Sequence, residues 1–236
     1  FSRGYFNLQE AATDEVANTW LSGNNLSDLT YISWDAKDSW VSDSYYWLFF
    51  NIALCNEFLR HCTDEEIARF SEAEQTEIRT FRSEARFMRS FSYWMVLDLY
   101  RQGPKVDENT PVTGYIPEAY DGIGMFDFIE SELKELVAEG ISSALPATNE
   151  YGRASKPVAW ALLARLYLNS AVYRGNVDTK YYTECITACK QVISNSAFYL
   201  EPEYAKLFNA DNHKRTHEIL FAMVCDATTS VTWGGG

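Results

Sequence analysis

The residues of this sequence best suited to chemistry are aromatic rings in a polar turn. Trp20 precedes the run Ser22–Asn25, whose Gly and Asn favour an exposed turn where a large apolar ring has no core to enter. An indole face packs well on the axial C–H groups of a pyranose, while the sugar hydroxyls need donors and acceptors at the ring edge. Trp20 with Asn24 and Asn25 therefore forms a candidate sugar-binding turn.

Two further residues extend this candidate site. Arg3 can donate two parallel hydrogen bonds to vicinal hydroxyls, although an ordinary surface arginine explains it equally well. Trp34 lies just before Asp35 and could extend the aromatic platform. The other tryptophans with helical spacing, at positions 40, 47, 94 and 160, are predicted to pack in the core.

Catalytic and metal-binding patterns are weak. His213 and His217 are four residues apart, a spacing that lets two imidazoles share a metal on a helix, but a turn precedes them and we expect no metal site. Acidic pairs such as Glu72/Glu74 could form a glycosidase dyad, yet 33 acidic residues make such pairs frequent by chance. With no GxSxG, phosphate-loop or HExxH motif, we expect no catalytic residue and no cofactor.

The composition limits the classes of partner that the protein can bind. The 236 residues carry 20 basic and 33 acidic side chains, a net charge of −13, which argues against nucleic acid and anionic lipid headgroups. A 47% hydrophobic content is typical of a globular chain with a large core, and no apolar run reaches the roughly 18 residues of a membrane span. The five cysteines show no CxxC spacing and are predicted to be buried thiols.

The elements that must position these residues are mainly helices. A loop over residues 103–123 interrupts the helical pattern, and the short apolar run Glu218–Val224 is interpreted as a strand. Apolar periodicity and capping residues predict helices over residues 38–62, 72–101, 124–140, 155–173 and 178–193, with a short one near 204–208. Small residues on the helix faces indicate a mainly α fold, an irregular repeat of tetratricopeptide-like helical pairs with long loops and little strand.

Six blocks of the sequence, which together cover essentially the whole chain, follow one another in a specific order: Thr13–Glu15, Phe50–Leu59, Phe81–Tyr100, Tyr151–Tyr173, Tyr182–Ile193 and Tyr204–Phe221. Taken in this order, the blocks resemble the SusD/RagB family. One departure is Arg101, which stands after Tyr100 where the family usually has Gly, and it concerns only the local turn.

The resemblance implies a surface-exposed lipoprotein of Bacteroidetes outer membranes. It implies a protein that binds an oligosaccharide without cleaving it and that sits as a lid on a TonB-dependent, SusC-like outer-membrane transporter. Members of the family are longer than 236 residues, so residues 1–236 are expected to form one SusD-like helical domain from the N-terminal or central part of a longer protein, without its C-terminal half. Membrane contact would then come only through a lipid anchor outside this chain.

The opening segment is particularly similar to a starch-binding member of the family, in which aromatic rings with Arg and Asn donors follow the curve of an α-glucan. That similarity carries over to Arg3, to Trp20 and to Asn24 or Asn25, and makes starch or maltooligosaccharide the expected ligand. Two alternatives remain: a helical-repeat scaffold whose main contact is the transporter, with another glycan or a peptide as ligand, and a helical glycoside hydrolase.

Overall fold

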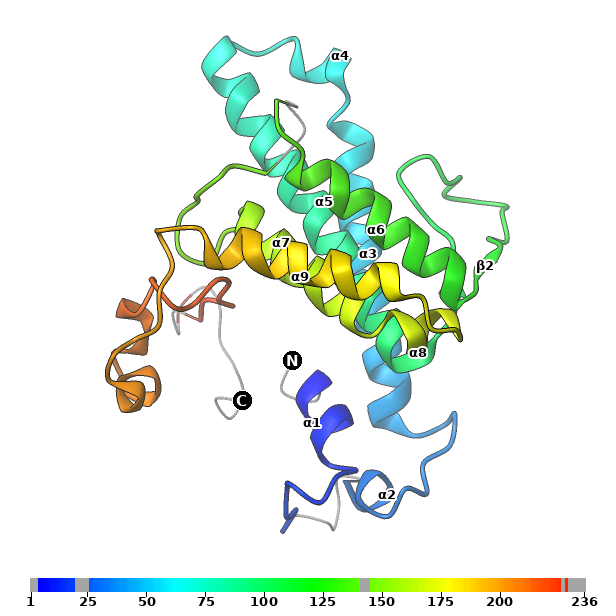
Figure 1. Ribbon diagram of the computed structural model, residues 1–236. Helices are drawn as coiled ribbons and strands as arrows, with labels where there is room; N and C mark the ends of the chain where they lie inside the picture. The colour runs from blue at the N-terminus through cyan, green and yellow to red at the C-terminus, as the bar shows by residue number, and fades with distance from the viewer. Residues whose placement is uncertain (1–3, 20–25, 141–144, 226–227, 229–236) are drawn as a thin grey trace. The chain divides into compact units, whose positions relative to one another are not determined.

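The computed structural model describes residues 4–19, 26–140, 145–225 and 228. Within these ranges the regular structure is helical apart from two strands of two residues each (Figure 1). By its contacts the chain divides into two compact units, residues 1–51 with 224–236, and residues 52–223. No helix in the described ranges combines the length and the apolar character that crossing a bilayer requires.

The first unit contains α1 (Tyr5–Glu10), α2 (Leu26–Thr30) and the beginning of α3 (Ser39–His61), which ends in the second unit. Asp38 caps α3 as predicted, because its Oδ1 accepts the Trp40 N–H at 2.8 Å. The core of this unit is small and consists of Ala11, Leu26, Leu29 and Trp40, with Leu8 packed against it.

The second unit is larger and continues from the end of α3. Its two strands pair antiparallel, with Gly103 opposite Tyr120. Its elements are α4 (Asp64–Ile67), α5 (Glu72–Tyr100), β1 (Gly103–Pro104), β2 (Ala119–Tyr120), α6 (Gly122–Val137), α7 (Lys156–Leu168), α8 (Ser170–Arg174), α9 (Thr179–Ile193), and the 3-10 helices η1 (Tyr204–Phe208) and η2 (Asn212–Lys214).

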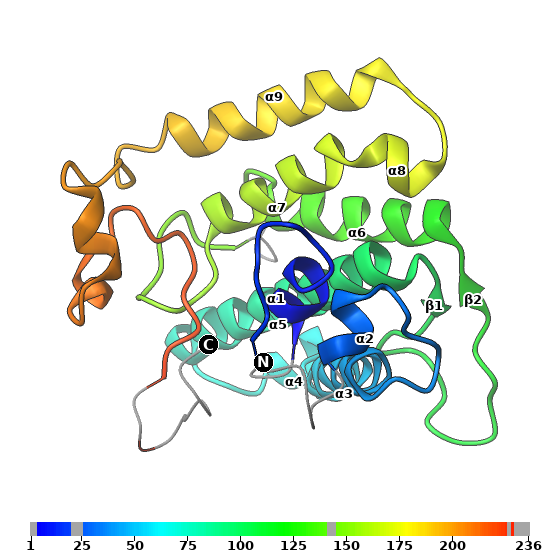
Figure 2. The ribbon, with the colours of Figure 1, turned by 90° about the horizontal axis from the view of Figure 1, so that it is seen from below.

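Four helices of the second unit lie side by side (Figure 2). α5 packs against α6, α6 against α7, and α7 against α9. Small residues permit this close approach, since Ala159 on α7 and Ala188 on α9 are fully buried. Gly122 is required at the start of α6, because a Cβ there would lie 2.5 Å from the carbonyl oxygen of Tyr173. The tetratricopeptide-like helical architecture is therefore confirmed.

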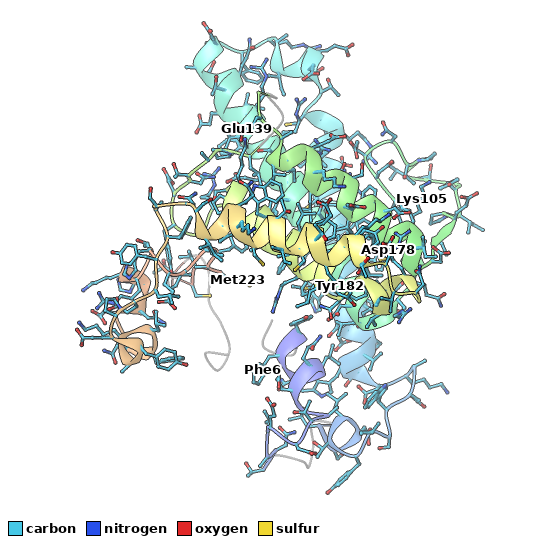
Figure 3. All side chains as sticks on the ribbon, viewed as in Figure 1. Phe6, Lys105, Glu139, Asp178, Tyr182 and Met223 are labelled. Atoms are coloured by element: carbon cyan, nitrogen blue, oxygen red, sulfur yellow. The ribbon has the colours of Figure 1, made fainter. Side chains whose placement is uncertain are left out.

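Two predicted helix starts, at Asp38 and Asp178, are confirmed by their caps. Asp178 caps α9 through the Lys180 N–H, and Figure 3 shows Asp178 and Tyr182 at that end of the helix. The single helix predicted over 155–173 is instead two helices, which meet at Asn169. The strand predicted over Glu218–Val224 is wrong, because Phe221 there packs edge-on against Phe87 of α5 and no strand ladder forms over the segment.

A buried arginine ties the long loop between α5 and α6 to the helices. Arg89 of α5, only 2% exposed, donates to Asn56 Oδ1 on α3 (2.8 Å), to Glu132 on α6 (2.8 Å) and to the carboxylate of Glu108 in the loop. Arg86 also binds Glu132, with Nη2 to Oε1 at 2.7 Å. Burial alone raises the pKa of Glu132, but its hydrogen bonds and ion pairs with the two arginines outweigh burial and hold that pKa below its usual range.

The departure from the family pattern at Arg101 has a structural counterpart. Arg101 ends α5 in the left-handed conformation, with φ of 64°, and its N–H donates to the carbonyls of Val96 and Leu97. This is the conformation that Gly adopts without strain. Arg101 therefore adopts a turn conformation that Gly would favour.

Candidate functional site

The turn between α2 and α3 exposes aromatic side chains. Tyr31 is 69% exposed, Ile32 67% and Trp34 42%. The turn begins where the buried Leu29 holds α2 in the core of the first unit. Ile32 then takes a left-handed conformation with φ of 54°, and the chain reverses as the Ser33 N–H donates to the carbonyl of Asp28 (2.8 Å). Of the predicted site residues, Trp34 therefore lies on the surface, and its role in binding stays a prediction.

Polar groups flank this aromatic turn. The Lys37 N–H donates to Asp35 Oδ1 at 2.7 Å, which holds the carboxylate of Asp35 close to the backbone. On the other side, Asn18 Nδ2 donates to Thr30 Oγ1 at 3.0 Å. Asn18 thus fixes the chain to α2 just before residue 20. Aromatic rings next to polar residues along the chain are the combination that a sugar-binding surface requires.

Four of the predicted site residues lie outside the described ranges. They are Arg3, Trp20, Asn24 and Asn25, and their assignment stays a prediction from the sequence. Asn18 and Leu26, which flank the segment from Trp20 to Asn25, are described and belong to the first unit together with Trp34.

The assignment of the other tryptophans is partly corrected. Trp40 and Trp94 are buried as predicted, and Trp160 is half-buried. Trp47 is 65% exposed, so its placement in the core is wrong. Helix α3 carries apolar residues on two faces, and the face with Leu48 and Ile52 is the buried one, which leaves Trp47 and Phe50 outside.

Tyr31 and Ile32 are not among the site residues predicted from the sequence. Turn signals in a sequence come from Gly, Asn and Pro, and a β-branched residue in a left-handed conformation leaves no such signal. The prediction that the cysteines are buried is wrong for all five, because Cys189 and Cys225 are exposed and Cys55, Cys62 and Cys185 are partly exposed. Cys185, one turn before Cys189, is half-buried and donates its thiol to the carbonyl of Ala164 on α7.

The described residues contain no cluster of three or more His, Cys, Asp or Glu side chains that could hold a metal ion. The acidic pair considered for glycoside cleavage is structural, because Glu74 forms a capping box with Ser71 at the start of α5. Hydrogen bonds from Ser71 lower the pKa of Glu74, whereas a general acid in glycoside cleavage needs a raised pKa. This pair therefore does not provide a catalytic dyad.

Comparison with known proteins defines the family. No family model matches the chain. Over its whole length, in an alignment of 238 residues, it is 31% identical to the starch-binding protein SusD of Bacteroides thetaiotaomicron. The chain belongs to the SusD/RagB family. It spans 40% of the length of that SusD relative.

Solved structures share the fold of this SusD-family chain. A SusD-like protein from Bacteroides fragilis superposes with a TM-score of 0.72 and 22% identity, over 92% of this chain and 40% of the other. A structure solved with a xylogluco-oligosaccharide superposes with a TM-score of 0.71 and 22% identity, over 94% of this chain and 44% of the other. At this level of identity the likeness shows the SusD-like helical fold.

Proposed function

We propose that this chain is the glycan-binding helical part of a surface lipoprotein of the outer membrane. It binds starch or maltooligosaccharides without cleaving them and delivers them to a TonB-dependent, SusC-like transporter. The observation that carries the proposal is the 31% identity, over the whole chain, to a protein named for starch binding. The exposed Trp34 turn, in the unit that also contains the Trp20 segment, supports it.

Each proposed site residue has a physical role in this function. Trp20 and Trp34 stack on the apolar faces of glucose rings, and Arg3 with Asn24 and Asn25 hydrogen-bonds the hydroxyls at the ring edges. A neutral glucan is compatible with the net charge of −13, which would repel an acidic polysaccharide. The choice of starch rests on the SusD relative, whereas a structural neighbour carries a xylogluco-oligosaccharide.

Native affinity electrophoresis tests the proposal. The protein is run in gels that contain amylopectin, xyloglucan or no glycan, beside the variant Trp20→Ala. We expect retardation in amylopectin alone and its loss in the variant. Retardation by xyloglucan only would show that the ligand is xyloglucan and not starch. Unchanged retardation of Trp20→Ala would remove Trp20 from the site.

A second candidate function is a scaffold that contacts the transporter. It is favoured by the outer surface of the helix stack, where α9 exposes Ile186 and Ile193 and the neighbouring α7 exposes Leu168. Helical-repeat proteins commonly bind partners through such surfaces. Co-purification with a large outer-membrane protein, without retardation by any glycan, would favour the scaffold over glycan binding.

A further inference from the structure

Ile32 adopts a conformation that its own side chain disfavours. Its φ of 54° lies in the left-handed region, where a β-branched residue crowds its own backbone. Two backbone hydrogen bonds hold this turn, from the Ile32 N–H to Leu29 O at 3.2 Å and from the Ser33 N–H to Asp28 O at 2.8 Å. Strained conformations of this kind concentrate at binding sites.

Burial does not offset the strain at this turn. The side chain of Ile32 is itself 67% exposed, and Tyr31 and Trp34 on either side of it are exposed as well. The turn thus keeps three large apolar side chains at the surface of the first unit, while Leu26 and Leu29 just before them are buried. An apolar surface of this kind, made from three residues of one short turn, indicates a contact site.

The chemistry of the turn fits a carbohydrate better than a lipid or an apolar protein surface. Two of its three large side chains are aromatic, and Tyr31 adds a phenolic hydroxyl that can donate to or accept from a sugar. In the sequence, Ser33 lies between Tyr31 and Trp34, and Asp35 directly follows Trp34. The Asp35 carboxylate accepts the Lys37 N–H at 2.7 Å. Aromatic faces with polar groups at their edges match the alternation of C–H faces and hydroxyls on a pyranose.

We propose that Tyr31 and Trp34, presented by the strained turn at Ile32, form a second aromatic subsite that stacks on pyranose rings of the same neutral glucan. This inference rests on the proposed function, and it adds Tyr31 to the binding residues. The subsite is formed by described residues of the first unit and does not depend on the placement of Trp20.

Isothermal titration with maltoheptaose tests the subsite. We expect Tyr31→Ala and Trp34→Ala each to weaken binding about fivefold, and the double variant to weaken it more than tenfold, because a ring contact contributes of the order of one tenfold step in affinity at most. Tyr31→Phe and Trp34→Phe keep a ring and should stay within about twofold of the wild type. Tyr204→Ala is the matched control, because Tyr204 is equally exposed but lies in the second unit.

The outcomes separate this proposal from the proposed function. If the wild type binds and Trp20→Ala weakens binding while both turn variants keep wild-type affinity, the second subsite is refuted and the glycan-binding function stands. If Tyr204→Ala weakens binding as much as the turn variants, the effect is not local and the subsite is refuted. If the turn variants lose only co-purification with an outer-membrane protein, the turn is a protein contact. Absence of binding by the folded wild type overturns both proposals.

Discussion

Replacement of Arg89 by Met should destabilise the second unit. Arg89 is buried, and its guanidinium joins Asn56 on α3, Glu108 in the loop and Glu132 on α6. Removal of one partner from a buried ion pair typically costs about 3–5 kcal/mol. Here the cost should be lower, because Glu132 keeps its two hydrogen bonds from Arg86, and the partly exposed Glu108 can regain water.

The remaining cost comes chiefly from the buried side-chain oxygen Oδ1 of Asn56, which loses its donor. An unpaired buried polar group costs about 1–3 kcal/mol. We therefore expect a loss of about 2 kcal/mol. With a urea m-value of roughly 2 kcal/mol/M, the midpoint of unfolding would fall by about 1 M, which circular dichroism at pH 7 measures directly.

A matched control is Arg69→Met. Arg69 also pairs with a glutamate, Glu66, but this pair lies on the surface and should contribute less than about 1 kcal/mol. If Arg89→Met unfolds within about 0.3 M urea of the wild type, the buried network does not hold the loop and the reasoning is refuted.

The pH dependence gives an independent check on the same network. The pKa of Glu132 lies below its ordinary value in the folded chain, so its ion pairs stabilise the fold above the unfolded pKa of about 4.3 and lose that effect as the pH falls toward the folded pKa. Without Arg89 the pKa of Glu132 should rise toward its ordinary value. The difference in stability between wild type and Arg89→Met should therefore narrow below about pH 4, and a constant difference would contradict the assignment.

Three further predictions follow from single positions. Arg101→Gly should raise the melting temperature by a few degrees, because Gly removes a left-handed strain of about 1 kcal/mol, and a lower value would show that the Arg101 side chain contributes more than the strain costs. Gly122→Ala should destabilise the chain by about 1–3 kcal/mol in urea unfolding, since its Cβ would meet Tyr173 O at 2.5 Å, and wild-type stability would mean that α6 and α8 can separate freely. Burial raises the pKa of Tyr120 to about 12, so Tyr120→Phe should leave the phenolate absorbance at pH 10.5 unchanged in a spectrophotometric titration, and a clear decrease would contradict the burial.

Local signals in the sequence determined the helices and where they begin. Asp38 and Asp178 precede apolar periodicity, and both accept backbone N–H groups of the helices they open. Such signals act over one or two turns, which is why they could be read without the fold. The resemblance to the SusD/RagB family was equally readable, because it depends on the order of sequence blocks along the chain.

Which face of a helix is buried was decided only by tertiary structure. α3 carries apolar residues on two faces, so periodicity alone could not place Trp47 outside and Leu48 inside. The same holds for the arginines of α5, because only the packing of α3, α5 and α6 makes Arg89 the buried one.

In the candidate site, too, one residue could be proposed from the sequence and another only from the structure. Trp34 could be proposed from the sequence, because a tryptophan directly before Asp35 is a local pattern. Tyr31 enters the proposed subsite only because of the left-handed turn at Ile32, which is held by the buried Leu29 and by the hydrogen bond from the Ser33 N–H to Asp28 O. The sequence alone thus determined most of the helices and the family, and it predicted an aromatic site, whereas tertiary packing decided which rings face the solvent, because burial depends on contacts between segments far apart in the chain.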